Sequence, residues 1–110
     1  MSVYVDDARL PFRGMLMCHM LADSLDELHA MAAAIGMQRR WFQPVSFPHY
    51  DLDLERRGAA VALGAVEVDR RGIVRVMRRL RADPVFMAAA REARGAAARQ
   101  TSPSDTSDLT

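Results

Sequence analysis

The sequence predicts a small α/β sandwich, a short mixed sheet covered by three to four helices, in a single domain over residues 1–99. Three observations lead to this prediction. Short apolar runs with β-branched residues alternate with longer segments whose apolar residues recur at helical spacing. The 110 residues suffice for one hydrophobic core. Cys18 is the only cysteine, so no internal disulfide can replace that core.

Two strands are predicted at the start of the chain, over residues 2–5 and 15–21. The first is rich in valine, and the second is an apolar run that only His19 interrupts. The connection contains a turn at residues 11–14 and is too short for a parallel crossover, so neighbouring strands would be antiparallel. In such a pair we expect Asp6 and His19 to lie about 13 Å apart, too far to share a metal ion.

Helical spacing of apolar residues predicts four helices, over residues 24–35, 52–63, 71–81 and 84–98. The first is the best defined, because Ser24 and Glu27 have the spacing of a capping box and Gly36 supplies a stop. Either Asp51 or Asp53 would cap the second helix. The third should turn four apolar side chains inward: Ile73, Val74, Met77 and Leu80.

The remaining segments are less regular. Residues 40–43 are interpreted as a short strand before a loop, and residues 65–68 as a further strand. The tail over residues 100–110 consists mainly of Ser, Thr and Asp and is predicted to be disordered.

Arginine supplies all fifteen basic residues, although the formal net charge is only +1. Nine arginines fall within residues 70–99, together with only two acidic residues. This segment is a candidate surface for nucleic-acid phosphates, although a solvated helix face would have the same composition.

The chain starts without a secretory signal pattern, and its apolar runs are far shorter than the roughly 20 residues of a membrane span. The single cysteine also favours a reducing compartment, so we expect a cytoplasmic protein with no membrane partner.

The three histidines all lie in the first half of the chain, each close in sequence to a carboxylate. That is the composition of a metal or acid–base site, although no familiar catalytic or metal-binding spacing accompanies it. His19, His49 and Asp51 are the candidate catalytic residues. Asp6 and Asp23 are the candidate metal ligands, with a divalent cation as the cofactor they would hold. The alternatives stay open, because Asp6 could simply begin a turn and His19 could be a core histidine.

Arginines and aromatic residues gather between residues 39 and 57. Arginine forks match the geometry of phosphate, and an aromatic ring offers a stacking face to a base. The alternative is that the aromatic rings belong to the core and the arginines are solvated. The candidate ligand-binding residues are Arg39, Arg40, Trp41, Tyr50 and Arg57.

Five segments occur in a fixed order: VYVDD (3–7), CHMLADSLDELHAMAAAIGM (18–37), RRWF (39–42), PHYDL (48–52) and RGAAVALGAVEV (57–68). Together they resemble a small bacterial and phage family described only as a domain of unknown function, DUF4031. The resemblance covers residues 3–80. It implies no activity, cofactor or site residue.

The residues favour a phosphate- or nucleotide-handling domain, with a metal-assisted hydrolase as its most specific form. In that hypothesis His19, His49 and Asp51 supply acid–base or metal-binding groups, and Arg39 and Arg40 hold the anion. Two other classes remain open: a non-catalytic module that binds nucleic acid, and an accessory module that contacts a protein partner or a second copy of itself.

Overall fold

The computed structural model describes residues 2–100. Within them a five-stranded mixed sheet and four α-helices confirm the predicted α/β class. No helix in this part of the chain is long and apolar enough to cross a membrane. In chain order the elements are β1 (Val3–Val5), β2 (Leu10–Phe12), β3 (Met15–Ala22), α1 (Leu25–Ala34), the 3₁₀ helix η1 (Arg39–Trp41), β4 (Tyr50–Asp53), α2 (Leu54–Ala62), β5 (Val66–Glu67), α3 (Arg70–Arg81) and α4 (Pro84–Gln100).

Strand β3 is the centre of the sheet. It pairs antiparallel with β1 and β2, one after the other, along one edge, and antiparallel with β4 along the other edge. Strand β5 extends the sheet by pairing parallel with β1. The predicted antiparallel pairing of the first two strands is therefore confirmed, and the long β3 holds together three shorter strands that would be marginal alone.

The turn between β2 and β3 explains a strand that the sequence pattern did not reveal. Arg13 has φ of 50° and Gly14 has φ of 79°. Two successive residues with positive φ form the type of two-residue turn whose twist matches an antiparallel hairpin. Glycine meets that requirement without strain, so residues 11 and 12, predicted to be part of the turn, belong to β2 instead.

Two further predictions about the middle of the chain were wrong. Residues 40–43, interpreted as a strand, overlap the 3₁₀ helix η1. Residues 50–53, partly assigned to the second helix, form strand β4, whose residues alternate between buried and half-buried positions. That period of two indicates a strand. Asp53 then caps α2 by accepting a hydrogen bond from the Arg56 main-chain N–H at 2.8 Å.

The helices begin and end close to their predicted limits. At the start of α1, the Ser24 hydroxyl accepts from the Glu27 N–H at 3.2 Å and donates to the Glu27 carboxylate at 2.8 Å. In α3 the inward face includes Val76, whereas Val74, predicted to face inward, is 44% exposed. The tail predicted for residues 100–110 lies outside the described residues, apart from its first residue.

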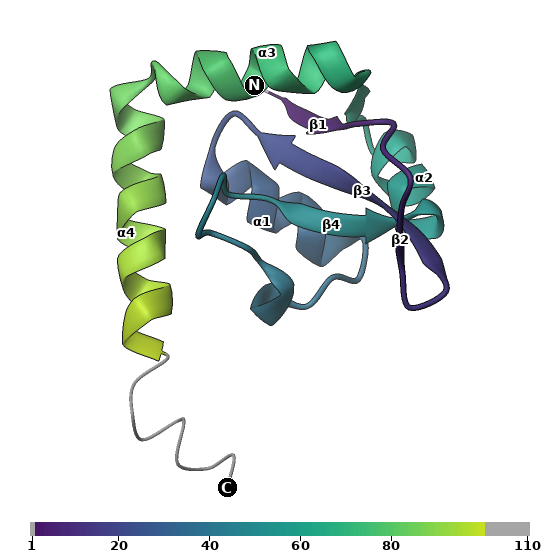
Figure 1. The fold of residues 1–110 in the computed structure, drawn as a ribbon, viewed down its shortest axis with the longest axis horizontal. Coiled ribbons are helices and arrows are strands. Elements are labelled where there is room, and N and C mark those ends of the chain that lie inside the picture. The colour runs from purple at the N-terminus through teal and green to yellow at the C-terminus, as the bar shows by residue number, and fades with distance from the viewer. Residues whose placement is uncertain (1, 101–110) are drawn as a thin grey trace, which may run out of the picture.

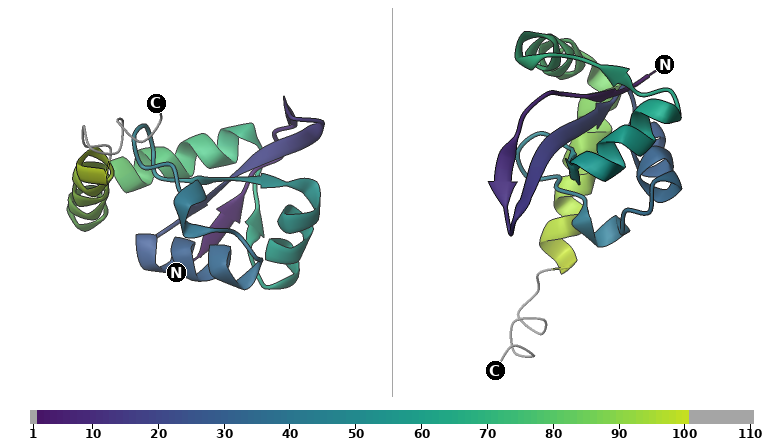
Figure 2. Two further views of the ribbon diagram at one scale, coloured as in Figure 1. Left: turned by 90° about the horizontal axis from the view of Figure 1, so that it is seen from below. Right: turned by 90° about the vertical axis from the view of Figure 1, so that its right-hand side faces the viewer.

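In Figure 1, α1 lies behind the strands and α3 runs along the top, beside β1. Helices α1 and α2 cover one face, where Cys18 and Met20 of β3 are fully buried. Helix α3 crosses part of the other face, where Leu21 packs against Leu80. Figure 2 shows, on its left, the strands between α3 on one side and α1 on the other. Because strand residues alternate between faces, His19 shares the α3 side with Leu21.

Two helical glycines provide a test of this packing. A Cβ added at Gly72 would lie 2.9 Å from the Val68 Cβ and 3.2 Å from the capping Asp69 Oδ1, whereas one added at Gly58 would meet nothing within 4 Å. Alanine is favoured over glycine in helices by about 1 kcal/mol. We expect Gly58→Ala to raise the melting temperature by several degrees and Gly72→Ala to lower it, measured by circular dichroism. Equal increases in both variants would contradict the close packing at Gly72.

Candidate functional site

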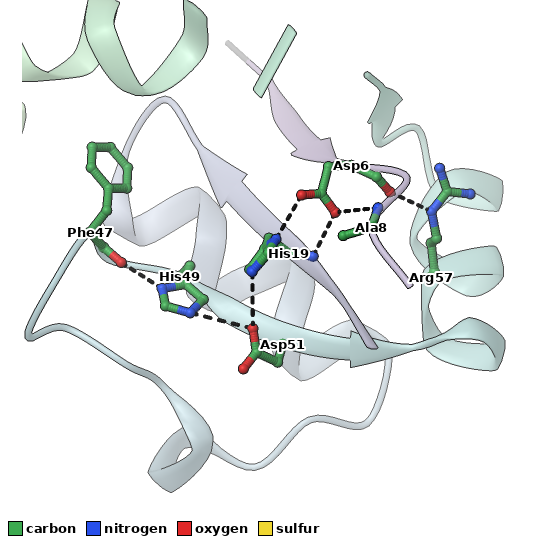
Figure 3. A network of polar contacts seen from close by, with 7 residues as sticks. All are labelled: Asp6, Ala8, His19, Phe47, His49, Asp51 and Arg57. Atoms are coloured by element: carbon green, nitrogen blue, oxygen red, sulfur yellow. Dashed lines mark hydrogen bonds and ion pairs between the residues drawn. The ribbon is translucent and has the colours of Figure 1, made fainter. Parts of the chain in front are cut away.

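Asp6, the residue after β1, is bound to His19 of β3 by its main chain and its side chain (Figure 3). Its N–H donates to the His19 carbonyl at 3.1 Å, and its Oδ1 accepts from the His19 N–H at 2.8 Å. Its Oδ2 lies 2.7 Å from His19 Nδ1. The expected separation of about 13 Å was wrong. Because Val5 pairs with Met20, the next residues along the two strands, Asp6 and His19, face each other.

The segment that begins at Asp6 forms a bulge. Residues 6–9, between β1 and β2, lie opposite only residues 18 and 19 of β3. A bulge of this kind interrupts main-chain pairing and re-aims side chains, and such bulges are common beside active sites. Here the Asp6 carboxylate restores the lost pairing, because it accepts from the His19 N–H in place of a main-chain carbonyl and also accepts from the Ala8 N–H at 3.3 Å.

The Asp6 carboxylate is held ionised although only 3% of the residue is exposed. Burial alone would raise the pKa of this carboxyl, but the hydrogen bonds from the His19 ring and the His19 main chain outweigh it, and the pKa is lowered. A carboxylate accepts hydrogen bonds and cannot donate one, so His19 Nδ1 carries a proton. Its Nε2 is then the basic atom of the neutral ring.

The same hydrogen bond changes the acid–base behaviour of His19. The bond to Asp6 raises the pKa of the His19 imidazole and outweighs burial, which acts in the opposite direction. An imidazole fixed at Nδ1 by a carboxylate has one ring orientation and one tautomer, so Nε2 is presented to a reactant in a constant position.

The His49 ring is also fixed through its Nδ1 atom, in this case by a main-chain carbonyl. Its Nδ1 lies 2.6 Å from the Phe47 carbonyl oxygen, which can only accept, so this Nδ1 also carries a proton. Its Nε2 lies 3.4 Å from Oδ1 of Asp51, and His19 Nε2 lies 4.0 Å from the same oxygen. The two imidazole ring centroids are 5.6 Å apart. Both Nε2 atoms therefore face one carboxylate oxygen.

Strand pairing explains why Asp51 stands between the two rings. The register of β3 and β4 places Asp51 opposite His19, and an isolated bridge between Gln43 and His49 holds the segment before β4. The Gln43 amide donates to Asp51 Oδ2 at 2.7 Å. Hydrogen bonding from His49, and then from Gln43, lowers the pKa of the Asp51 carboxyl against the opposing effect of burial.

A cleft of about 650 Å³ opens beside the histidines, between α3 and the bulge over residues 6–9. Both imidazoles and Asp6 line it, as do the side chains of Arg9 and Arg70. Ile73 and Met77 of α3 contribute apolar surface. The volume suits a small-molecule ligand, and the two arginines supply positive charge for an anionic one. We refer to it as the histidine cleft.

Two of the predicted ligand-binding residues have other partners. Arg57 of α2 donates from Nε to the Asp6 carbonyl at 2.8 Å and from Nη1 to Glu67 at 3.0 Å, so it braces the residue that holds His19. Tyr50 is completely buried, with its hydroxyl 2.8 Å from Nδ1 of His29. Neither residue lines the histidine cleft.

The other three predicted ligand-binding residues, Arg39, Arg40 and Trp41, form η1, away from the histidine cleft. The Arg40 guanidinium donates to the Gln38 side chain. Trp41 is 38% exposed, and the Arg56 guanidinium lies 5.7 Å from the centroid of its ring. Two arginines do line the cleft, Arg9 and Arg70. Arg9 was missed, because no local pattern distinguishes it from the other arginines, and Arg70 was predicted only as part of the basic segment over residues 70–99.

The two candidate metal ligands are not brought together. Asp23 accepts from the Tyr4 hydroxyl at 3.0 Å and from Arg79 at 2.7 Å, whereas Asp6 is bound to His19. Between residues 2 and 100, no group of three or more His, Cys, Asp or Glu side chains is placed to hold a metal ion. A divalent cation stays a prediction from the sequence.

Comparison with known proteins gives a family and no chemistry. A family model described as a protein of unknown function, DUF4031, matches residues 3–80. The matched residues include Asp6, His19, His49 and Asp51. No curated protein and no solved structure matches the chain.

The Asp6–His19 bond predicts a specific pH dependence of stability. The pKa of His19 is raised above its ordinary value of 6.5 in the folded protein, so the bond stabilises fully below pH 6.5 and its contribution falls as the pH rises through the folded pKa. We expect the melting temperature of the wild type to exceed that of His19→Gln by a few degrees at pH 5.5, and by less at pH 8.5. His29 is present in both proteins, so its titration cancels. A difference that grows with pH would contradict the assignment.

Proposed function

The chain belongs to the DUF4031 family, and from the geometry of its residues we propose that it is a hydrolase of phosphate esters that uses His19 and His49 as general base and general acid. One observation carries the proposal. The two imidazoles are each held through Nδ1, by Asp6 and by the Phe47 carbonyl, and each directs Nε2 towards Oδ1 of Asp51. Paired imidazoles fixed in this way are suited to moving two protons in one reaction.

The histidine cleft holds groups suited to an anionic substrate, beside the carboxylates of Asp7 and of Asp6, which is bound to His19. Arg9 and Arg70 line it together with the two imidazoles. A guanidinium binds phosphate oxygens through paired N–H donors, and in a partly enclosed cleft it also stabilises the charge that develops as phosphorus is attacked. A cysteine nucleophile is not part of the scheme, because Cys18 is fully buried and burial raises the pKa of its thiol to about 11.

The proposed reaction starts with His19 neutral and His49 protonated on both ring nitrogens. It transfers two protons, forms one bond to phosphorus and breaks another. His19 Nε2 accepts a proton from water, and the resulting hydroxide oxygen forms a bond to phosphorus. The bond from phosphorus to the leaving oxygen breaks, and His49 Nε2–H donates its proton to that oxygen. The products are the hydrolysed phosphate and an alcohol. Asp51 Oδ1 lies between the two Nε2 atoms, where it balances the positive charge that moves from His49 to His19.

Two substitutions test the scheme directly. We expect His19→Gln and His49→Gln each to lower kcat/KM for bis(p-nitrophenyl) phosphate by about 100-fold or more, because each removes one proton transfer. The matched control is His29→Gln, which changes the third histidine and should leave the rate within about twofold. Release of p-nitrophenolate measures the rate, and circular dichroism checks that each variant is folded.

The same assay decides whether a divalent cation takes part. Rates are compared after dialysis against EDTA and after addition of Mg²⁺, Mn²⁺ or Zn²⁺. A rate that persists without metal supports acid–base catalysis by the histidines alone, and a rate that returns only with a cation supports the metal-assisted form. Wild-type rates at the level of the uncatalysed reaction under all these conditions would reject a hydrolase of phosphodiesters.

Helix α3 favours a second candidate function, non-catalytic binding of nucleic acid. Arg70, Arg71, Arg75 and Arg78 are all exposed and line one shallow depression on α3. Parallel arginines on an exposed helix match a run of backbone phosphates. The neighbouring Arg79 is instead paired with Asp23 at 2.7 Å, so the solvent-facing arginines are those available to an external polyanion.

The salt dependence of binding tests this second candidate. If α3 binds phosphates, the affinity for a fluorescent single-stranded oligonucleotide falls steeply with salt, with a logarithmic slope of about −0.7 for each phosphate neutralised. We expect Arg75→Ala with Arg78→Ala to reduce the slope by about 1.4, while Arg91→Ala on α4 leaves it unchanged. An identical slope in all three proteins would exclude α3 as the binding surface.

A further inference from the structure

A second groove, of about 700 Å³, opens on the same face of the sheet as the histidine cleft. Its walls come from the β2–β3 hairpin, from η1 and from the start of α2. Met17 and Asp53 line its floor, and both lie on the same face as His19, because Met17 is two residues before it and pairs with Asp53. Phe12 and Trp41 line its sides. We refer to it as the aromatic groove.

Two aromatic rings of this groove are exposed to solvent. Phe12 is 52% exposed and Trp41 is 38% exposed. An arginine guanidinium lies over each ring. The Arg13 guanidinium is 5.2 Å from the centroid of the Phe12 ring, and the Arg56 guanidinium is 5.7 Å from the centroid of the Trp41 ring. Flat aromatic and guanidinium surfaces of this kind stack on nucleobases. Arg56 is held beside Trp41 by its ion pair with Asp53 at 2.7 Å.

The aromatic groove and the histidine cleft adjoin each other. Leu10 of β2 lines both. Asp51 connects them chemically, because its Oδ1 faces the two imidazoles while its Oδ2 accepts from Gln43, which also lines the aromatic groove. A ligand that occupied both cavities would pass Leu10 and Asp51 between the aromatic rings and the two imidazoles.

We infer that the aromatic groove binds the nucleobase of the substrate while the phosphate lies in the histidine cleft. This inference rests on the proposed hydrolase and names its substrate class, a phosphate ester that carries a nucleobase. The apolar rings stack against the base, and the Gln43 amide is placed to meet the hydrogen-bonding groups on the base edge. A lipid chain would match the apolar rings and offer nothing to the guanidinium planes and the amide beside them.

The chain provides its own optical probe, since Trp41 is the only tryptophan. We expect adenosine 5′-monophosphate to quench Trp41 fluorescence in a saturable manner, because stacking of the base changes the surroundings of the indole. Ribose 5-phosphate has the same phosphate without the base and is expected to cause no quenching. Quenching by ribose 5-phosphate equal to that by the nucleotide, or none by either at millimolar concentration, would overturn the inference.

A substitution in the groove separates stacking from general effects on the protein. We expect Phe12→Ala to weaken nucleotide binding by about tenfold or more, because it removes one stacking ring and leaves the fluorescent Trp41 in place. The matched control is Leu63→Ala, at a similarly exposed apolar residue, 58% exposed, that does not line the groove. An unchanged dissociation constant in Phe12→Ala would contradict base stacking in this groove.

Failure of the nucleobase site can be distinguished from failure of the proposed hydrolase. If nucleotides quench Trp41 in both the wild type and His19→Gln but no phosphate ester is hydrolysed, the base site stands and the hydrolase fails. If hydrolysis depends on His19 but no nucleotide quenches Trp41, the reaction stands and the base site fails. If an oligodeoxyadenylate of six nucleotides binds more tightly than the mononucleotide, the natural ligand is a nucleic-acid strand. If the two bind with equal affinity, the natural ligand is a free nucleotide.

Discussion

The carboxylate of Asp6 takes a place in the sheet that a main-chain carbonyl would otherwise fill. It accepts from the His19 N–H at 2.8 Å while its second oxygen holds the His19 ring at 2.7 Å. One buried side chain thus pairs with β3 where the bulge interrupts the main-chain hydrogen bonds, and it also fixes the His19 imidazole. An unpaired carboxylate at this depth would be costly, so the fold and the site depend on the same bond.

The rest of the site extends from that bond along β3 and β4. The register places Asp51 opposite His19, Gln43 orients the Asp51 carboxylate, and His49 approaches from the segment before β4. On the other side Arg57 binds the Asp6 main-chain carbonyl. The site is consequently built around paired strands and braced by a helix, with Asp6 directly after β1 and His49 directly before β4. Such support gives the precise positions that proton transfer needs.

Composition was sufficient to predict the candidate catalytic groups, because His19, His49 and Asp51 are few among many apolar residues, and the structure brings these three together. The geometry around them could not be predicted, since the contact between Asp6 and His19 depends on a two-residue turn and a bulge that periodicity does not encode. The helices were predicted well, since caps and apolar spacing are local signals. Tyr50 was predicted to bind a ligand, but its side chain is fully buried in the core. The sequence could not separate these roles, because a ligand-binding and a core aromatic ring have the same sequence signal.

The most direct test of this account measures the titration of His19 itself. Two-dimensional NMR of the histidine side chains across pH 5–9, in the wild type and in Asp6→Asn, gives the His19 pKa in each protein. The account predicts a pKa above the ordinary value of 6.5 in the wild type, and a fall to that value or below it in Asp6→Asn, where burial is no longer outweighed. An unchanged His19 pKa in the variant would contradict the central role of the Asp6 carboxylate.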